Sequence, residues 1–451
     1  MLYAVFAFVL LQLVVGALAA RRVRSQDDFL LAGRRVGPFL AAASIFATWF
    51  GAESCLAAAG DAYRHGVSIW STEPLAYGIC LVLMGLWFAG RLWHLRITTL
   101  PEYFGRRFGR VAERLAAVLL LPSSVLWAAA QIRAFGHVVV EHADGAIHLE
   151  AAIALAAVVA IAYTMLGGLL ADIYTDVVQG FVLILGLGVL AWAVLANTPA
   201  DGGAPPTPTE PPTGSMLDLV EAWAVPICGS VLAQEALSRS FAARSATVAR
   251  TAAVAGGLCY LLVGLVPLSL GAVAPTLLPG LDEPESVLLR LAGDHLPTVL
   301  RVLFVSALVA AILSTVDSCL LVAASVVTRN LLPTRFHAGI WPARLACGCV
   351  GLVAFGLALS SDTVHDLVEE ASGFGSAGVF VLGVLGLYTR FGGPWAGCGA
   401  LLAGLVVWVG TRHLTIVSTD HPYLWSLAAA AVGAGLGGSI DRRRRARPAG
   451  P

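Results

Sequence analysis

The stretch AAILSTVDSCLLVAASVVTRN, residues 310–330, is an apolar segment that carries five hydroxyl groups and one carboxylate. Successive residues of a helix are turned by about 100°, so residues three or four apart share a face. One face of this predicted helix carries Ala311, Ser314, Thr315, Ser318 and Ser325. Small residues of this kind also favour close helix packing in membranes. Adjacent hydroxyls beside an exposed carbonyl are, however, the oxygen ligands that a hard cation prefers, and we interpret this face as a cation site.

The rest of the chain is as apolar as this segment. Of its 451 residues 58% are hydrophobic and only 12% are charged, and the mean hydropathy is +0.82. A soluble domain carries about 25% charged residues. Apolar runs of about 20 residues recur along the chain and are typical of membrane-spanning helices. This composition argues against a soluble enzyme. The basic tail RRRRAR at 442–447 is too isolated to indicate a nucleic-acid partner.

Glycine, proline and arginine residues divide the chain into thirteen predicted membrane-spanning helices. These cover residues 2–20, 37–58, 73–93, 111–140, 149–168, 171–195, 218–239, 247–275, 299–329, 340–360, 364–389, 393–411 and 422–439. The sequence therefore predicts an all-α integral membrane protein.

Arginine placement predicts the orientation. The first apolar segment is followed by RRVRS rather than preceded by positive charge, which indicates an anchor helix and not a signal peptide. Nearly all other arginines, Arg239 among them, then fall in loops on one side, and the opposite loops receive Arg64, Arg290 and Arg412. Because cytoplasmic loops are rich in arginine, we expect the N-terminus outside and the C-terminus in the cytoplasm of an inner or plasma membrane protein.

Two spans contain interruptions. The first reads FATWFGAES at its middle and combines Gly51 with the acidic Glu53. The second contains Pro226 and Gly229 ahead of a Gln-Glu pair. Broken helices five spans apart are typical of an inverted five-plus-five repeat that binds substrate and ions at the breaks. Two kinked structural helices are the alternative.

The expected organisation follows from these breaks and from the external Pro/Gly-rich linker. It comprises an anchor helix and loop (1–36), a first five-helix repeat (37–195), the linker (196–217), a second five-helix repeat (218–390), two peripheral helices (391–439) and a basic tail (440–451).

Buried charges mark two further places. In residues 162–182, Gly167-Gly168 is predicted to separate two helices, and Asp172 at the start of the second complements the helix dipole. Asp176 lies one turn further into the membrane. It is better placed on the path by which an ion leaves towards the cytoplasm. Arg133 lies within a span and needs a carboxylate partner or an anionic ligand. The candidate partners are Glu53, Glu235, Asp317, Glu369 and Glu370.

These features together resemble the sodium:solute symporter family, which includes sodium/glucose and sodium/proline symporters. The resemblance covers about residues 25–390. It rests on the stretches DDFLLAGRRVGPFLAAASIFATWFGAES, TLPEYFGRRFG, AYTMLGGLLADIYTDVVQGFVLILG, QEALSRSFAARSATVAR and AAILSTVDSCLLVAASVVTRN. It implies a five-plus-five core made of the second to eleventh spans, and alternating access driven by a sodium gradient.

The resemblance also implies site residues. The sodium ligands would be the carbonyl groups of Ala47, Phe50 and Ala311 and the hydroxyl groups of Ser314 and Thr315, and Asp176 would lie on the ion's exit path. Asp317 or Ser318 would contribute to a second ion site. The candidate solute-binding residues are Trp49, Glu53, Trp127, Gln131, Gln234 and Glu235. Acidic and aromatic side chains together favour a cationic or zwitterionic solute.

The sequence thus predicts a transporter and no enzyme: a symporter that uses sodium as its coupling ion and imports a small organic solute. Its expected partners are the solute and membrane lipid, and the oligomeric state stays open. One alternative is proton coupling through Asp176 or Glu53, and another is a sensor that binds a solute without transporting it.

Overall fold

The structure is a computed structural model that describes residues 23–141, 147–197, 214–337, 339–361, 364–414 and 419–446, with a few isolated positions before residue 23. The described chain is helical apart from its connections and one isolated bridge, in which Val36 pairs with Ala243. The predicted anchor helix, most of the external linker and the end of the basic tail lie outside the described residues.

The helices up to the external linker are α2 (Gln26–Leu31), α3 (Pro38–Trp49), α4 (Ala58–His65), α5 (Thr72–Leu83), α6 (Gly90–His94), α7 (Leu100–Phe108), α8 (Arg110–Glu141) and α9 (Leu149–Asn197). Those after it are α10 (Met216–Ser230), α11 (Gln234–Ala242), α12 (Ala246–Leu277), α13 (Val287–His295), α14 (Thr298–Val326), α15 (Trp341–Ser360), α16 (Val364–Gly373), α17 (Ser376–Tyr388), α18 (Pro394–Arg412) and α19 (Pro422–Ala446).

Within the described residues nine helices are long and apolar enough to cross a membrane, or up to eleven if each of two bent pairs is one span. The two predicted helices 149–168 and 171–195 lie in the element α9, which consists of two helical segments joined at a kink. Gly168 interrupts it with φ 59° and ψ −172°, a backbone conformation that glycine adopts at no steric cost. The chain is therefore a multi-pass membrane protein with the predicted glycine break, while the count of thirteen spans stays a prediction.

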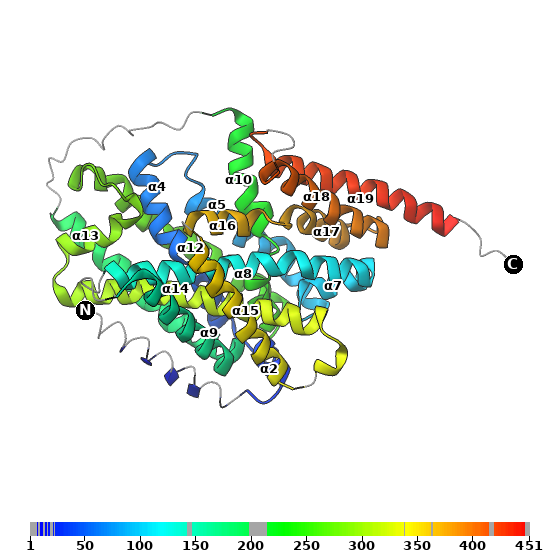
Figure 1. The fold of residues 1–451 in the computed structure, drawn as a ribbon, viewed down its shortest axis with the longest axis horizontal. Coiled ribbons are helices and arrows are strands. Elements are labelled where there is room, and N and C mark those ends of the chain that lie inside the picture. Colours follow the sequence, from blue (N-terminus) through cyan, green and yellow to red (C-terminus); the bar gives the residue numbers. More distant parts are fainter. Residues whose placement is uncertain are drawn as a thin grey trace.

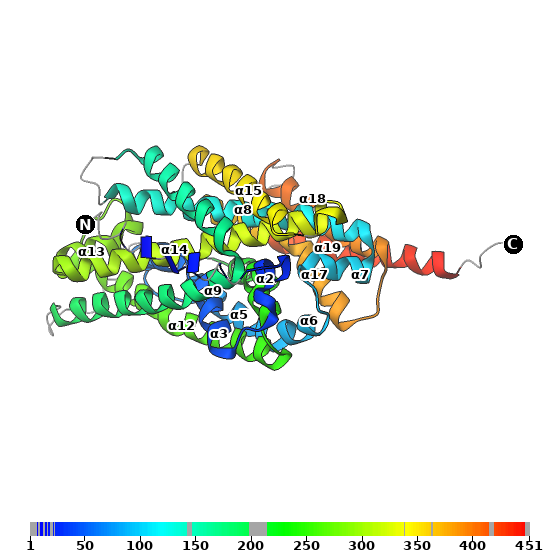
Figure 2. The same ribbon diagram turned by 90° about the horizontal axis from the view of Figure 1, so that it is seen from below.

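Helix α14 forms the centre of the molecule. Every residue from Phe304 to Val326 is buried, and the helix packs against α9, α8, α15 and α3 (Figure 1 and Figure 2). Small residues allow neighbouring helices to approach it closely. The oxygen-rich stretch that opens the sequence analysis thus lies in the interior and not against lipid.

Both predicted broken helices are present. α3 continues through a π-helical turn, Glu53–Ala57, into α4 with a bend of 67°, and α10 continues into α11 with a bend of 40°. The position of the second break differs from the prediction. Pro226 lies inside α10, and the chain leaves the helix at residues 231–233, where Ala233 is extended.

A further break was not predicted. The single span expected at 364–389 is divided into α16 and α17 at Gly375, whose φ is 68°. A left-handed backbone conformation favours glycine and ends a helix. The run SGFGSAG at 372–378 contains three glycines, but small residues also serve close packing in unbroken membrane helices, so the run did not reveal this interruption.

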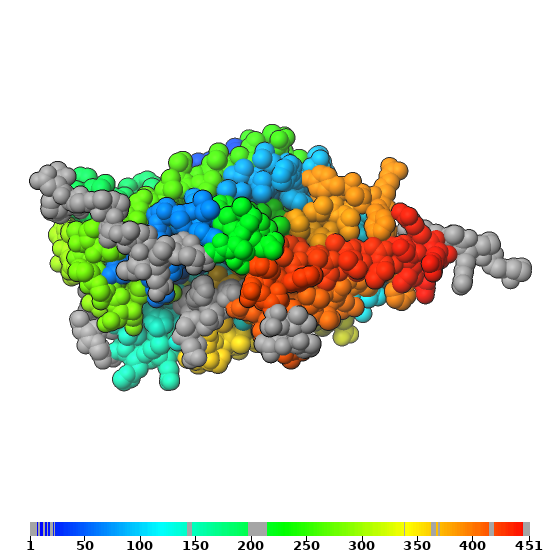
Figure 3. All heavy atoms as spheres, turned by 90° about the horizontal axis from the view of Figure 1, so that it is seen from above, coloured from blue at the N-terminus to red at the C-terminus, as the bar shows by residue number. Residues whose placement is uncertain are grey.

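The peripheral helices pack on one another outside the central bundle. α18 and α19 lie side by side, and Figure 3 shows α19, in red, running along the surface and beyond the body of the molecule. Their outer faces carry exposed apolar side chains such as Val406, Trp425 and Leu436. Exposed apolar residues along helices of this length fit a lipid environment.

Candidate functional site

The first broken helix ends at a fully buried position. Phe50, the residue after α3, has φ −90° and ψ 79°, so the chain leaves the helix there. The last carbonyl groups of a helix have no partner within it, and Ala47 and Phe50 belong to this region. A Cβ atom on Gly51 would lie 2.8 Å from Glu53 Oε2 and 3.0 Å from Thr315 Oγ1. The glycine therefore lets α14 approach the break.

Helix α14 meets the end of α3 through a hydroxyl group. Thr315 Oγ1 donates to the main-chain oxygen of Thr48 at 3.0 Å and to that of Ala311 at 3.3 Å. The structure thus places two of the predicted sodium ligands, Ala311 and Thr315, beside the C-terminal turn of α3, which contains Ala47. A set of carbonyl and hydroxyl oxygens is suited to a hard cation.

Asp176 lies at the same contact. Its carboxylate accepts hydrogen bonds from Ser314 on α14 and Ser44 on α3, and Thr48 Oγ1 lies 3.5 Å away. The residue predicted on an exit path therefore directly contacts a hydroxyl predicted to bind sodium. Ser44 and Thr48 escaped the sequence analysis because serine and threonine are common in membrane helices and carry no distinctive spacing here.

Arg239 is the largest fully buried side chain of this region, and its prediction as a cytoplasmic loop residue is wrong. The guanidinium donates to Asp172 and Ser318, and its Nη2 lies 3.5 Å from Asp176 Oδ2. The carboxylate of Asp172 therefore pairs with an arginine from another helix, in addition to its place near the start of the helix segment that follows Gly168. Arg239 is the last residue of a predicted span, and the sequence alone does not distinguish the end of a span from the start of a loop.

The two residues predicted at a second ion site have different partners. Ser318 Oγ contacts Arg239 and lies 3.3 Å from Thr48 Oγ1. Asp317 Oδ1 accepts a hydrogen bond of 2.9 Å from Thr164 on α9. Adjacent residues of a helix point about 100° apart, which explains the separation.

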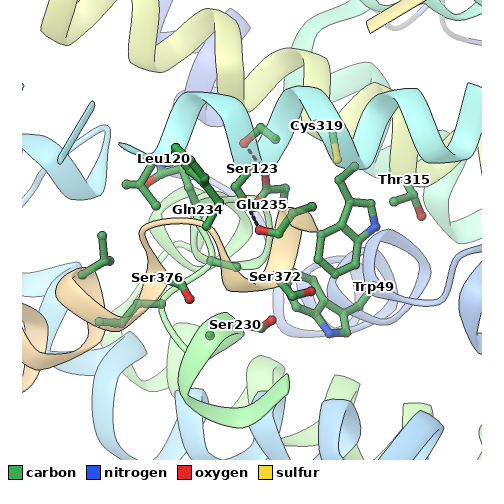
Figure 4. A pocket seen from close by; sticks show the side chains of 18 of the residues that line it. Trp49, Leu120, Ser123, Ser230, Gln234, Glu235, Thr315, Cys319, Ser372 and Ser376 are labelled. Carbon is green, nitrogen blue, oxygen red and sulfur yellow. Dashed lines mark hydrogen bonds between the residues drawn. The ribbon is translucent and has the colours of Figure 1, made fainter. Parts of the chain in front are cut away.

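A pocket lies beside the contact between α3 and α14, and Figure 4 shows Trp49, Thr315 and Glu235 around it. Its other polar lining residues are Thr48, Ser123, Ser124, Ser230, Gln234, Ser372 and Ser376. Four of the six predicted solute-binding residues line the pocket, namely Trp49, Trp127, Gln234 and Glu235. Thr48 and Thr315 belong both to the pocket wall and to the helix contact.

Three aromatic rings form a cluster, and two of them, Trp49 and Trp127, line the pocket. The centroids of Trp49 and Trp127 are 5.8 Å apart, those of Trp49 and Tyr77 are 6.5 Å apart, and those of Tyr77 and Trp127 are 6.3 Å apart. The rings come from α3, α5 and α8. Tyr77 was not predicted, because its own segment does not indicate that the ring meets tryptophans from two other helices.

The polar candidates divide into two groups. Glu235 lines the pocket, and its Oε1 accepts a hydrogen bond of 2.5 Å from Ser124. Glu53 instead accepts a hydrogen bond of 2.6 Å from Gln131 Nε2, and Gln131 Oε1 accepts one of 3.1 Å from the Ala52 amide. Glu53 and Gln131 thus hold the broken segment of α3 rather than line the pocket.

Gln234 lines the pocket, but its amide group is used elsewhere. Its Oε1 accepts a hydrogen bond of 2.6 Å from the Leu100 amide, and its Nε2 donates to the Thr98 carbonyl at 3.2 Å. These bonds tie α11 to the start of α7. The side chain therefore has a positioning role at the base of the pocket.

Arg133 donates to the main-chain oxygen of Ala358 at 2.9 Å, in the last turn of α15. Its predicted candidate partners have contacts of their own. Glu53 binds Gln131, Glu235 binds Ser124, Asp317 binds Thr164 and Glu370 binds His413. The side chain of Glu369 lies outside the described residues.

Two broken helices, a buried contact rich in oxygen atoms and an aromatic pocket beside it define a membrane solute transporter. The chain belongs to the sodium:solute symporter family, whose sequence model matches residues 29–407. The resemblance stated from the motifs is therefore confirmed. The relatives are transporters, which agrees with the expectation that the protein is no enzyme.

Individual relatives cover most of the chain. It is 27% identical to the human high affinity choline transporter 1 over 402 residues, which are 81% of this chain and 69% of the human protein. It is also 27% identical to the Escherichia coli sodium/proline symporter over 406 residues, which are 81% of this chain and 78% of that protein. A structure of a sodium-coupled sialic acid symporter in a substrate-bound outward-open state shares the fold, with a TM-score of 0.80, 16% identity and 97% coverage of both chains.

Proposed function

We propose that the protein is a sodium-coupled symporter that imports a small cationic or zwitterionic solute by alternating access. One observation carries the proposal: Thr48 and Thr315 belong both to the pocket wall and to the contact between α3 and α14. An ion bound at that contact would hold two walls of the solute pocket in one arrangement. Ion and solute would then favour the same conformation, which is the thermodynamic requirement for coupling.

In this proposal sodium is bound by five oxygen atoms from the two helices. They are the carbonyl oxygens of Ala47, Phe50 and Ala311 and the hydroxyl oxygens of Ser314 and Thr315. All five residues are buried. Sodium would stabilise the outward-open arrangement, and closure would expose it to the cytoplasmic side past Asp176. The predicted orientation, with the N-terminus outside, and the repeat boundaries belong to the same proposal.

The pocket favours a positively charged solute. Cations bind over the faces of tryptophan and tyrosine rings, with a gain of up to about 2 kcal/mol where water is excluded. Trp49 and Trp127 supply two such rings in the pocket wall, Tyr77 packs against both of them, and the carboxylate of Glu235 supplies a negative charge in the pocket. A quaternary ammonium group fits both features. The choline transporters among the relatives make choline the first solute to test.

The test is uptake into proteoliposomes that contain the purified protein. Radiolabelled choline, glycine betaine and proline are offered separately at fixed pH, with either sodium or potassium as the outer cation. We expect accumulation of a cationic or zwitterionic solute with sodium and a rate near that of empty vesicles with potassium. Equal accumulation with both cations would refute sodium coupling, and binding without accumulation would identify a sensor.

Proton coupling is the second candidate mechanism. The observation that favours it is the buried carboxylate of Glu53, which is hydrogen-bonded to the neutral amide of Gln131. A buried acid of this kind is a typical proton carrier in transporters. Uptake driven by an inward proton gradient in sodium-free vesicles would support this mechanism, and its absence alongside sodium-driven uptake would exclude it.

A further inference from the structure

We propose that the protein binds an anionic phospholipid on the side of the membrane that is predicted to be cytoplasmic. Two neighbouring grooves form the site, an apolar groove for one acyl chain and a charged groove for the phosphate. The site is separate from the ion ligands, and its occupant does not depend on which solute is transported.

The apolar groove lies between α10, α17 and the π-helical segment Met84–Ala89, which continues α5. Its volume is about 810 Å³, and its lining includes Leu83, Phe88, Phe380 and Val384. Trp87 and Tyr388 also line it and are 52% and 44% exposed, so the groove is open to the outer surface of the bundle. Exposed apolar side chains on membrane-spanning helices face lipid tails. An acyl chain is therefore the occupant that this surface fits.

Arg91 lies at one end of the apolar groove. Its Cζ atom is 4.5 Å from the centroid of the Tyr388 ring, and its Nη1 donates to Tyr388 Oη at 2.8 Å and to the Trp87 carbonyl at 2.9 Å. Tryptophan and tyrosine rings gather at the level of the lipid headgroups, and arginine side chains near the ends of spans reach the same level. The groove therefore extends from the membrane interior to the headgroup layer.

The charged groove begins at the next residue of the chain. Its volume is about 760 Å³, and it is lined by Thr389, Arg390, Phe391, Gly392, Gly438, Asp441 and Arg442. Arg390 follows α17, whereas Arg442 belongs to α19, and its Cζ lies 5.3 Å from the centroid of the Phe391 ring. Guanidinium groups suit phosphate because their N–H groups match its oxygen atoms. Two arginines from distant parts of the chain thus meet where the acyl-chain groove ends.

Asp441 is the acidic residue of this lining, and its carboxylate has partners of its own. It accepts hydrogen bonds from the amides of Gly393 at 2.7 Å and Ala396 at 3.0 Å, at the start of α18, where the helix dipole favours a negative charge. Arg107 brings a further guanidinium to the same loop and donates to the Phe391 carbonyl at 2.9 Å. Arg107, Arg390 and Arg442 outnumber the single carboxylate, so an anionic headgroup complements the groove. Basic pockets between spans bind such headgroups.

The apolar groove also reaches the second broken helix. Val231, the residue that follows α10, lines the groove, and Cys228 lines both the groove and the solute pocket. An acyl chain in the groove would pack against this break from the lipid side. The bound lipid would thereby support one wall of the solute pocket.

The test is native mass spectrometry of the whole protein released from detergent micelles. The micelles contain equal amounts of phosphatidylglycerol and phosphatidylcholine with the same acyl chains. We expect phosphatidylglycerol to be retained preferentially, by roughly tenfold or more, because its headgroup carries a net negative charge. Equal retention of the two lipids would overturn the inference.

Glycerol 3-phosphate separates a lipid from a soluble phosphate. It supplies the phosphate without acyl chains, so at the same concentration we expect the protein to retain far less of it than of phosphatidylglycerol. Retention of glycerol 3-phosphate equal to that of the lipid would assign the charged groove to a soluble anion and overturn the lipid site.

A double substitution tests the headgroup contacts. Arg390→Gln with Arg442→Gln removes two positive charges from the lining, and the affinity for phosphatidylglycerol in a lipid titration should fall by roughly 30-fold. The matched control is Arg335→Gln with Arg443→Gln, because both arginines are exposed and neither lines a groove. We expect the control to bind as the unaltered protein does. Unchanged affinity in the first variant, or an equal loss in both, would overturn the inference.

The acyl-chain groove is tested by filling it. Val384→Phe places a larger side chain in the groove and leaves the arginines intact, so retention of phosphatidylglycerol should fall severalfold. Val406→Phe on α18 is the control, because Val406 is 66% exposed and lies outside the groove lining. Equal retention in the two variants would overturn the placement of the chain. If Val384→Phe does not yield folded protein in size-exclusion chromatography, the arginine variants decide.

Discussion

Thr315 on α14 donates a hydrogen bond to the main-chain oxygen of Thr48 at the end of α3, over a distance of 3.0 Å. Both residues also line the aromatic pocket. The region predicted to bind sodium and the region predicted to bind solute therefore share these two residues. Coupling between two sites needs a structural element that both ligands bias, and the contact between these two helices is such an element.

The first prediction concerns the two hydroxyl groups of α14. Replacing Ser314 and Thr315 together by alanine removes two of the five proposed sodium ligands. A ligand present at 100 times its dissociation constant stabilises a protein by about 2.7 kcal/mol, and this gain should disappear in the double variant. The measurement is the thermal shift produced by sodium chloride against potassium chloride in detergent.

Ser325→Ala is the control for that experiment. Ser325 shares the face of α14, but its Oγ bonds to the carbonyl of Val322 within the same helix, at 2.7 Å. Its removal should leave the sodium-dependent shift unchanged. A normal shift in the double variant would rule out Ser314 and Thr315 as the ion ligands.

The second prediction concerns the glycine at the break of α3. Gly51→Ala would place a Cβ atom 2.8 Å from Glu53 Oε2 and 3.0 Å from Thr315 Oγ1. Overpacking of this kind costs about 1–3 kcal/mol, so the apparent affinity for sodium should fall by roughly 5- to 150-fold. Gly37→Ala at the start of α3 is the control, because its Cβ would have no atom within 4 Å. Equal sodium dependence in both variants would contradict the proposed role of the close approach.

The third prediction separates two acidic residues that the sequence treated alike. Glu235→Gln keeps a hydrogen-bonding group opposite Ser124 and removes the negative charge from the pocket, so KM for a cationic solute should rise by about tenfold. Glu53→Gln should leave KM unchanged, because Glu53 lies at Gln131 outside the pocket lining. Initial uptake rates over a range of solute concentrations measure both. The reverse pattern would place the solute at Glu53.

The fourth prediction concerns the aromatic cluster. Trp127→Ala removes one of the two tryptophan rings that line the pocket and should raise KM for a quaternary ammonium solute by up to roughly 30-fold, which corresponds to about 2 kcal/mol. Trp127→Phe should restore part of the affinity. Trp192→Ala is the control, because Trp192 is 68% exposed on α9. An unchanged KM in Trp127→Ala would argue against recognition through the ring faces.

Much of the architecture was accessible from local pattern alone. Apolar runs of spanning length, the glycine breaks at Gly51 and Gly168 and the oxygen-rich face of α14 depend only on neighbouring residues. The break of the second broken helix was misplaced, because Pro226 is accommodated inside α10. The interruption at Gly375 was missed, because glycines are also frequent in unbroken membrane helices.

The site was only partly accessible. Ser314, Thr315 and Trp49 stand out through spacing and through the family motifs. Arg239 was placed in a loop, although it is buried against Asp172, a residue 67 positions away. Tyr77 and Trp127 come from different helices, and the sequence of neither helix indicates that the two rings are in contact.

Membrane insertion and helix boundaries follow from the amino acids themselves, because hydropathy, helical periodicity and glycine geometry act within one or two turns. Which buried charges pair and which rings meet follows from the packing of distant helices. A charge in a low-dielectric interior must find its partner wherever the fold supplies one. For that reason the broken helices could be read from the chain, whereas the Arg239–Asp172 pair and the aromatic cluster required the assembled bundle.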